Sequence, residues 1–244
     1  SIQTLARRDW PETDLIIVDE AHILWSAMTK YLENNDTPVI ALTATPFTKS
    51  MGKYYNNLIK PTSMQELTEN GFLSPYIAYS HDKPDLKGIK TVAGEYHEGQ
   101  LGERMSDPKL IGCLVDTWLK HGDNQQTVCF CVNVAHAHFV SAEFDKVNVT
   151  NAVITGATPE DERIESFKGF NKKNIKILIN VFCLTAGWDA DVRCMIDAAP
   201  TKSDTRHTQK IGRICRTAKG KEHAILLDHA GNLLNLGFPE DLEI

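Results

Sequence analysis

The sequence lacks a long apolar run, a secretion signal and paired cysteines, and each absence excludes a class of protein. No stretch approaches the roughly 20 apolar residues that cross a bilayer, and the first ten residues lack the pattern of a signal peptide. The six cysteines form no CxxC pair and show no spacing with histidine that is typical of zinc sites. We therefore expect reduced, mostly buried thiols in a cytoplasmic protein.

The chain also lacks an excess of positive charge. Its formal net charge is −6 and its pI is about 5.8. This balance excludes a uniformly basic nucleic-acid binder, but not a protein that holds nucleic acid in one local groove. The hydrophobic fraction of 42% is enough for a buried core, and 244 residues accommodate one large domain or two modest ones.

Short apolar runs alternate with segments of helical pattern along most of the chain. Continuous apolar runs are typical of strands that are buried on both faces, as in parallel sheets. We expect strands at residues 15–18, 39–42, 128–132, 152–154, 175–181, 194–198 and 224–227. The alternation predicts an α/β fold, in which helices cover both faces of a parallel sheet. Ligands of such sheets collect at the carboxyl ends of the strands.

Turn-forming residues divide the chain into two parts. The sequence from Ser63 to Glu66 has the spacing of a capping box and predicts a short helix that ends near Gly71. Prolines and glycines are frequent beyond this helix, so we expect a first domain at residues 1–74 and a second at residues 75–244. In the second domain we expect one helix at residues 107–121 and a second that follows the strand at 128–132 and ends near residue 146. A third helix should begin with Thr158 as its N-cap and Pro159 in its first helical position, and a fourth should cover residues 203–216.

Two adjacent acids, Asp19 and Glu20, directly follow the first expected strand. Hydrolysis of a nucleoside triphosphate requires a carboxylate that holds magnesium and a second group that orients the attacking water. Asp19 suits the magnesium role and Glu20 the water-positioning role, because the turn after a strand lets neighbouring side chains diverge. A solvated loop with a chance acidic pair is the alternative, and the buried strand before the pair argues against it.

Residues 15–22 (LIIVDEAH) resemble the Walker B strand and DEAH box of superfamily-two helicases. Residues 43–46 (TATP) resemble motif III of the same superfamily. The resemblance implies that hydroxyl groups on Thr43 and Thr45 contact the DEAH histidine, His22, or the acids, and couple hydrolysis to nucleic acid. It also places this histidine among the catalytic residues.

Residues 209–216 (QKIGRICR) resemble motif VI, whose signature is QxxGRxxR. Arg213 and Arg216 are three residues apart on the expected helix, so we expect them to share a face. Arginine suits the charge that builds up on a transferring phosphoryl group, because its guanidinium is planar and permanently charged. The resemblance implies that both arginines point at the ATP phosphates, with Gln209 as a further catalytic residue, and it leaves open which arginine is the finger. A solvated basic helix face is the alternative.

Residues 184–189 (LTAGWD) resemble motif V. In relatives the threonine end of this motif touches the nucleic-acid backbone, and its aspartate links to the nucleotide or to motif VI. The resemblance therefore implies that Thr185 contacts the nucleic-acid backbone and that Gly187 lies at this backbone or at the nucleotide. It also implies that Asp189 has a coupling role, at the nucleotide or at motif VI. A glycine turn after a strand is the alternative.

Two further segments resemble sites of nucleic-acid contact in the superfamily. Thr155 and Gly156 follow an expected strand, where relatives have a loop that contacts the nucleic-acid backbone. Gln3, Thr4 and Arg8 lie before the Walker B strand, in a segment that contacts the backbone in relatives. A shortened helix start is the alternative for this second segment.

No GxxxxGK[ST] phosphate loop occurs in the sequence. Without such a loop no row of backbone amides holds the phosphates of ATP. The resemblance therefore implies tandem RecA-like lobes with parallel sheets, of which the first is incomplete and the second complete. We expect the missing loop upstream of Ser1, and we expect this chain alone to hydrolyse almost no ATP.

Within the superfamily the sequence most resembles RadD-like DNA-repair helicases and the motor subunits of restriction enzymes. The segments 3–8, 186–190, 228–232 and 236–239 carry this likeness. It implies an ATP-dependent DNA helicase or translocase that uses ATP and Mg²⁺ and acts on single-stranded or forked DNA. An RNA helicase, and a non-catalytic nucleic-acid-binding module that has lost its phosphate loop, are the alternatives. Retention of the acids and the arginines favours the motor.

Overall fold

Two compact units make up the described chain. The computed structural model describes residues 2–5, 7–8, 10–80, 83–184 and 189–242. Within these ranges the chain divides between Pro61 and Thr62. Helix α3, Met64–Glu69, belongs to the second unit, because Met64 packs against the core of that unit. The expected domain boundary after residue 74 stays a prediction.

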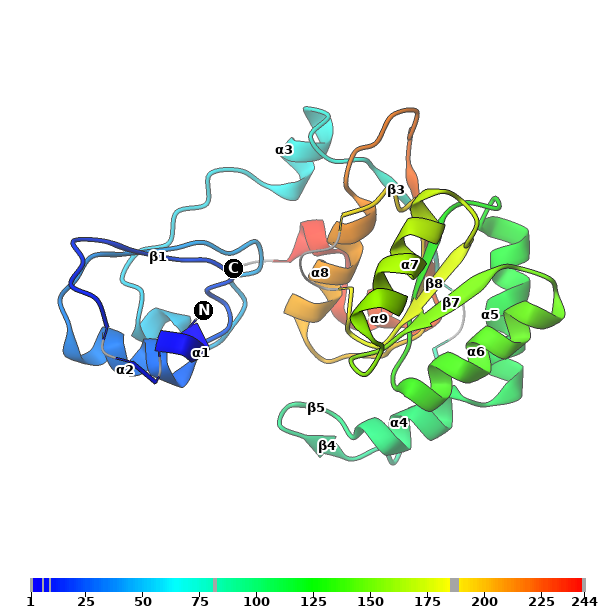
Figure 1. Cartoon of the computed structure of the whole chain (residues 1–244), viewed down its shortest axis with the longest axis horizontal. Coiled ribbons are helices and arrows are strands. Elements are labelled where there is room, and N and C mark those ends of the chain that lie inside the picture. Colours follow the sequence, from blue (N-terminus) through cyan, green and yellow to red (C-terminus); the bar gives the residue numbers. More distant parts are fainter. Residues whose placement is uncertain (1, 6, 9, 81–82, 185–188, 243–244) are drawn as a thin grey trace. The chain divides into compact units, whose positions relative to one another are not determined.

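The first unit contains a two-stranded parallel sheet and short helices (Figure 1). Its elements are α1 Ile2–Leu5, β1 Ile16–Val18, α2 Ser26–Asn34, β2 Val39–Ala41 and the short 3-10 helix η1 Met51–Lys53. Ile17 of β1 pairs with Ile40 of β2. Their side chains are 62% and 48% exposed, so one face of this sheet is open. Both strands lie where the sequence predicts them.

A six-stranded parallel sheet forms the centre of the second unit, in the order β3-β10-β9-β6-β8-β7 (Figure 1). Its strands are β3 Tyr76–Ser80, β6 Thr127–Phe130, β7 Asn151–Ile154, β8 Ile177–Asn180, β9 Cys194–Asp197 and β10 Ala224–Asp228. Besides α3, its helices include α4 Glu98–Met105, α5 Pro108–His121, α6 Val134–Lys146, α7 Glu160–Asn171, α8 Asp204–Ile214 and α9 Asn232–Leu236. The unit also contains an antiparallel hairpin, β4 Thr91–Val92 and β5 Glu95–Tyr96, and the 3-10 helix η2 Pro239–Asp241. None of the helices in the described ranges is long and apolar enough to cross a membrane.

Helices cover both faces of this sheet, and this arrangement confirms the predicted fold class. Successive side chains of β6 and the residue after it point to opposite faces of the sheet. Val128 and Phe130 therefore belong to one core cluster, and Cys129 and Cys131 belong to the other. The first cluster includes residues of α4, α7, α8 and α9, and the second includes residues of α5 and α6. Helix α8 is therefore fixed by the core along one of its faces.

Two parts of the second unit differ from the prediction. The sequence predicts no strand between Phe72 and residue 127, but β3 forms there because it pairs along its length with β10, starting with Tyr76 opposite Ala224. Pairing with a distant strand overrides the local signal. Thr158 is not the N-cap of α7, since Pro159 takes that position. The Thr158 hydroxyl instead accepts a hydrogen bond from the backbone N–H of Thr155 at 2.9 Å.

Candidate functional site

Asp19 and Glu20 follow β1 at its carboxyl end. Asp19 Oδ1 accepts a hydrogen bond from the backbone N–H of Glu20 at 2.9 Å. Glu20 has a φ of 52°, a left-handed conformation that costs about 1 kcal/mol or more in a residue other than glycine. Both residues are exposed. The strained backbone and the open carboxylates are features of a binding or catalytic loop.

The side chain of His22 connects the loops that follow β1 and β2. Its Nδ1 lies 3.0 Å from Thr43 Oγ1 and 3.3 Å from Glu20 Oε2. Thr43 Oγ1 also accepts the backbone N–H of Thr45 at 3.0 Å. Thr48 Oγ1 donates to the carbonyl of His22 at 2.8 Å. The structure thus brings together the residues that the sequence predicts as the catalytic and coupling groups of this unit.

The two acids suit a magnesium ion that arrives with a nucleotide. Magnesium usually takes one or two protein carboxylates and completes its six ligands with water and phosphate oxygens. A dedicated protein cage needs more ligands, and the described ranges contain no group of three or more His, Cys, Asp or Glu residues placed to hold a metal. Asp19 can supply one such carboxylate, with the carboxylate of Glu20 beside it.

Helix α8 presents two residues of the expected motif VI. Its buried face consists of His207, Lys210, Ile211 and Ile214. Gln209 and Arg213 are partly exposed on the same helix. Arg216 is not on this helix, because α8 ends at Ile214 and Cys215 is its C-cap. The prediction that both arginines share a helix face is therefore wrong, since the chain leaves the helix before it reaches the second arginine.

Arg216 pairs with the aspartate of the expected motif V. Its Nη1 donates to Asp189 Oδ1 at 2.5 Å. The two side chains are 43% and 83% exposed, so the pair itself contributes little to stability. This contact joins two segments that the resemblance links to each other. Thr185 and Gly187, the other predicted residues of motif V, lie outside the described residues.

The inner face of α8 carries a buried ion pair that the sequence does not reveal. Lys210 Nζ donates to Asp197 Oδ1 at 2.6 Å, and both side chains are 2% exposed. Asn232 Nδ2 donates to Asp197 Oδ2 at 2.8 Å. Asn232 Oδ1 accepts the backbone N–H of Thr201 at 3.0 Å. This network fixes α8 relative to the ends of β9 and β10.

Asp228 orders the turn that follows β10. Its carboxylate accepts the backbone N–H groups of Ala230, Asn232 and Leu233 at 3.1, 3.1 and 2.9 Å. Burial raises the pKa of Asp228, and the negative charge of Asp197 adds to this effect. In the sequence this arrangement is signalled by the run DHAGN at residues 228–232, one of the segments that carry the family likeness.

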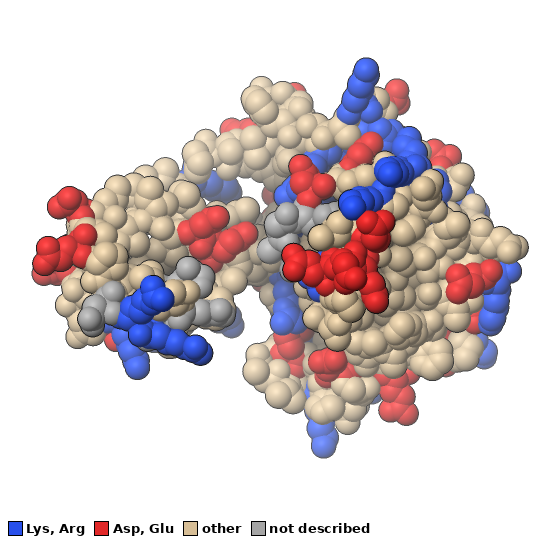
Figure 2. Space-filling model, viewed as in Figure 1, with Lys and Arg blue, Asp and Glu red and all other residues tan. Residues whose placement is uncertain are grey.

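The loop after β7 offers little to a phosphate. Thr155 is only 8% exposed, and its hydroxyl accepts the backbone N–H of Ala157 at 3.2 Å. Gly156 is exposed. Residues 160–162, at the start of α7, are all acidic, and Figure 2 shows acidic side chains gathered over this part of the helix. The inward threonine and the acidic surface both count against a phosphate contact by the Thr155 side chain, while the contact at Gly156 stays a prediction.

The predicted contacts near the N-terminus lie in and after α1. Gln3 and Thr4 belong to this helix, and Arg8 follows it. Thr4 and Arg8 are exposed, as a contact with nucleic acid requires. Their nucleic-acid role stays a prediction.

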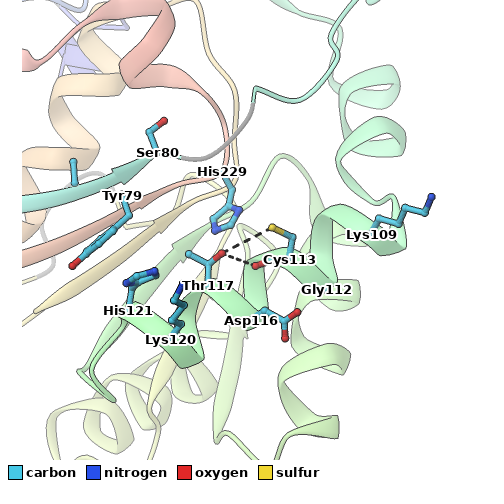
Figure 3. A pocket seen from close by; sticks show the side chains of 11 residues that line it. Tyr79, Ser80, Lys109, Gly112, Cys113, Asp116, Thr117, Lys120, His121 and His229 are labelled. Atoms are coloured by element: carbon cyan, nitrogen blue, oxygen red, sulfur yellow. Dashed lines mark hydrogen bonds between the residues drawn. The ribbon is translucent and has the colours of Figure 1, made fainter.

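A groove of about 750 Å³ lies between α5 and the edge strand β3 (Figure 3). The ring of Tyr79 stacks on His121, with ring centroids 4.2 Å apart. Lys109, Asp116 and His229 are among its polar lining residues. None of the predicted site residues lines this groove, so it is separate from the expected nucleotide site.

The second unit thus has a six-stranded parallel sheet covered by helices, and Asp189, in the segment before β9, pairs with Arg216, which follows α8. Residues 109–218 match the family described as "Helicase conserved C-terminal domain". This segment includes Asp189, Gln209, Arg213 and Arg216. The sequence of residues 109–218 is therefore similar to helicase C-terminal domains.

Several proteins of known sequence are similar to most of this chain. A 51.5 kDa protein of a Lactococcus phage is 27% identical over 93% of this chain and 51% of its own length. A Saccharomyces cerevisiae protein provisionally named as the ATP-dependent helicase IRC3 is 26% identical over 95% of this chain and 36% of its own length. The EcoAI type I restriction endonuclease subunit of Escherichia coli is 24% identical over 82% of this chain and 29% of its own length. The chain thus spans about half or less of the length of these relatives.

Solved structures share the fold. A fragment provisionally assigned as the HsdR subunit of a type I restriction enzyme from Vibrio vulnificus has a TM-score of 0.71 at 24% identity, covering 93% of this chain and 45% of that chain. The ATP-dependent type ISP restriction-modification enzyme LlaBIII, bound to DNA, has a TM-score of 0.67 at 19% identity, covering 93% and 18%. The comparisons confirm the resemblance to superfamily-two helicases and to restriction-enzyme motors. The narrower likeness to RadD-like helicases stays a prediction.

Proposed function

We propose that this chain is part of an ATP-driven DNA helicase or translocase. The observation that carries the proposal is the ion pair between Arg216 and Asp189, in a segment that matches the helicase C-terminal domain. A scaffold that only binds nucleic acid needs neither this pair nor the acids Asp19 and Glu20.

Each polar residue of the site has a separate task in the proposal. Asp19 holds the magnesium ion that accompanies ATP, and Glu20 orients the attacking water. Arg213 and Arg216 stabilise the charge that develops on the transferring phosphoryl group. The 3.0 Å contact between the DEAH histidine and the motif III threonine relays the state of the hydrolysis site towards nucleic acid.

The phosphates of ATP also need a loop that this sequence does not contain. Backbone amides in a glycine-rich loop normally hold the phosphates, and the printed sequence has no such motif. We therefore expect another polypeptide segment to supply these amides, and we expect the 244-residue chain by itself to be inactive.

DNA, in single-stranded or forked form, is the proposed nucleic acid. The LlaBIII enzyme was solved with DNA, and the EcoAI subunit belongs to a restriction endonuclease. RNA is the second possibility, because yeast Dbp5, solved with RNA and ADP BeF3, shares the fold with a TM-score of 0.57 at 14% identity, covering 99% of this chain and 62% of that chain.

Replacement of the water-positioning acid tests the proposal in the full-length gene product that contains this sequence. Glu20→Gln should abolish DNA-stimulated ATP hydrolysis and leave ATP binding intact, because the amide keeps the size of the side chain but not its charge. Glu12→Gln, at another exposed position of the first unit, is the matched control and should leave turnover unchanged.

Replacement of the paired arginine tests the second half of the site. Arg216→Ala should lower turnover by about 10³-fold or more, the effect of losing an arginine finger. Arg104→Ala is the control, because Arg104 is 40% exposed and also pairs with an aspartate, Asp85. Undiminished hydrolysis in Arg216→Ala would contradict the motif VI assignment.

A second candidate function is nucleic-acid binding without hydrolysis. In this candidate Asp19, Glu20 and Arg216 take no part in turnover. Turnover of the full-length gene product should be compared with single-stranded, duplex and forked DNA and with RNA. Binding of these nucleic acids without any ATP turnover would favour the second candidate over the motor.

A further inference from the structure

Arg216 lies where helix geometry no longer sets its position. Helix α8 ends at Ile214, Cys215 caps it, and Arg216 follows the cap. The Arg216 side chain is 43% exposed, so surrounding side chains do not enclose it. Because a catalytic guanidinium must be held to about 0.5 Å, the backbone at Arg216 needs partners outside the helix.

Lys221 supplies such partners at three backbone carbonyls. Its ammonium donates to the carbonyl oxygens of Ile214, Arg216 and Val192 at 2.6, 2.8 and 2.8 Å. An ammonium has three donors, so these bonds use its full capacity. The first two carbonyls belong to the end of α8 and to the arginine itself. The third lies just before β9 and three residues after Asp189.

The location of Lys221 also matches the electrostatics of a helix end. Carbonyls in the last turn have no partner within the helix and carry partial negative charge, so a nearby cation is favourable. Burial lowers the pKa of Lys221, and the positive charge of Arg193 lowers it further. The negative charges of Asp191 and Cys215 act in the opposite direction and raise this pKa. Lys221 is thus a partly buried cation whose donors are directed to the backbone.

Other residues hold the same loop from different sides. Arg193 donates to the carbonyls of Lys219 and Gly220 at 2.9 and 3.0 Å. The backbone N–H of Ser74 donates to the carbonyl of Cys215 at 2.7 Å. Arg216 itself forms an isolated antiparallel bridge with Leu73, and Ser74 Oγ donates to its carbonyl at 3.4 Å. Lys221 differs from these residues because its one ammonium contacts both the Arg216 carbonyl and the segment that follows Asp189.

We propose that Lys221 is a positioning residue that sets Arg216 opposite Asp189 for phosphoryl transfer. The proposal rests on the ATPase function proposed above and adds to it a residue that does not touch ATP. Because one ammonium holds both segments, the backbones near Asp189 and Arg216 keep a fixed separation. Loss of the ammonium leaves α8 and Arg213 in place, and Arg216 keeps its backbone bridge to Leu73 but loses its link to Val192.

A double-mutant cycle on ATP turnover in the full-length gene product separates positioning from general stabilisation. Lys221→Met should lower kcat by about 10- to 100-fold, as expected when a catalytic group is displaced by about 1 Å. The KM for ATP should stay nearly unchanged, because the lost interaction acts in the transition state. In the Arg216→Ala background the same change should cause no further loss. Equal losses in both backgrounds, or no loss with Arg216 present, would overturn the proposal.

Two further variants serve as controls. Lys176 also donates to a backbone carbonyl, that of Asn124 at 2.7 Å, and burial lowers its pKa as well. Lys176→Met should therefore leave kcat unchanged. Lys221→Gln keeps two N–H donors and should give an intermediate kcat, which keeps the test valid if the methionine variant does not fold. Wild-type kcat in a folded Lys221→Gln protein would count against the proposal.

Amide hydrogen exchange gives a second readout in the chain without nucleotide. Lys221→Met should speed exchange at residues 214–221 and leave exchange in β6 unchanged. Faster exchange throughout the second unit would indicate a merely structural role.

If Arg216→Ala lowers turnover and Lys221→Met does not, only the role of Lys221 fails. If Arg216→Ala leaves turnover intact, the catalytic assignment of Arg216 fails, and the role of Lys221 fails with it.

Discussion

At the scale of single residues, burial separates two ion pairs of the second unit. Arg216 and Asp189 are open to solvent, where a pair contributes about 0–1 kcal/mol. Lys210 and Asp197 are 2% exposed, and removing such ions from water costs several kcal/mol each. Hydrogen bonds from Asn232 and from the lysine itself offset that cost. The exposed pair therefore contributes little to stability and is accessible for the proposed chemistry, while the buried pair fixes α8.

The buried pair leads to a prediction about stability. Lys210→Met should lower the free energy of unfolding by about 3–5 kcal/mol, because Asp197 would stay buried without its cation. Adding Asp197→Asn should restore part of the loss, since no charge is then left in the core. Urea unfolding of the wild type and both variants measures the difference. A double variant less stable than Lys210→Met would show that the unpaired carboxylate is not the cause.

The residues of the proposed site could be chosen as candidates because short sequence runs carry them. The DEAH run at residues 19–22 and the QxxGRxxR run at residues 209–216 are recognisable without any contact. The resemblance also implies the contact of Thr43 with His22 and a link from Asp189 to motif VI. The buried partner of Lys210 could not be predicted, because contacts across the chain define it: Lys210 and Asp197 are 13 residues apart in sequence. Lys221 stands among other charged residues of a loop, and only the folded chain shows which carbonyls it meets.

At the scale of helices and strands, the sequence predicts helix starts best where a side chain caps them. Ser63 Oγ accepts the backbone N–H of Glu66 at 3.1 Å, and Glu66 Oε2 accepts the N–H of Ser63 at 2.8 Å. This confirms the capping box of α3. Strand β3 was missed because its stabilising partner, β10, lies far along the chain. Local signals therefore predicted the capping box of α3, but neither the N-cap of α7 nor the edge of the sheet.

The N-cap of α5 offers a test at this scale. Asp107 Oδ1 accepts the backbone N–H of Lys109 at 2.8 Å and caps a helix that lies in the core. Asp107→Ala should lower the free energy of unfolding by about 1 kcal/mol. Asp116→Ala, at an exposed position of the same helix, should change it by less than about 0.5 kcal/mol. Denaturant unfolding of the two variants checks this, and equal effects would contradict the capping role.

At the scale of the whole molecule, the net charge opposes the proposed partner. The chain carries −6 at neutral pH, and Figure 2 shows acidic side chains over the start of α7. Nucleic acid is a polyanion, so binding has to use local positive groups against this background. The affinity for nucleic acid should therefore depend strongly on the salt concentration, because salt screens these local charges.

Salt dependence tests this expectation. The affinity of the full-length gene product for single-stranded DNA should fall steeply between about 50 and 200 mM salt, with a slope of log K against log salt of about −0.7 per phosphate contacted. Fluorescence anisotropy with a labelled oligonucleotide measures the slope. An uncharged peptide nucleic acid of the same base sequence is the control and should bind weakly at every salt concentration. A flat response to salt with DNA would argue against a nucleic-acid partner.

The open face of the β1–β2 sheet affects how the protein behaves in solution. Parallel sheets are usually covered on both sides, and a ribbon of two strands has an unpaired edge on each side. Ile17 and Ile40 place apolar surface next to such edges, which favours association between copies as concentration rises. Measurements of ligand affinity on this chain therefore belong in the dilute range, where a change in signal reports the added ligand rather than a neighbouring molecule.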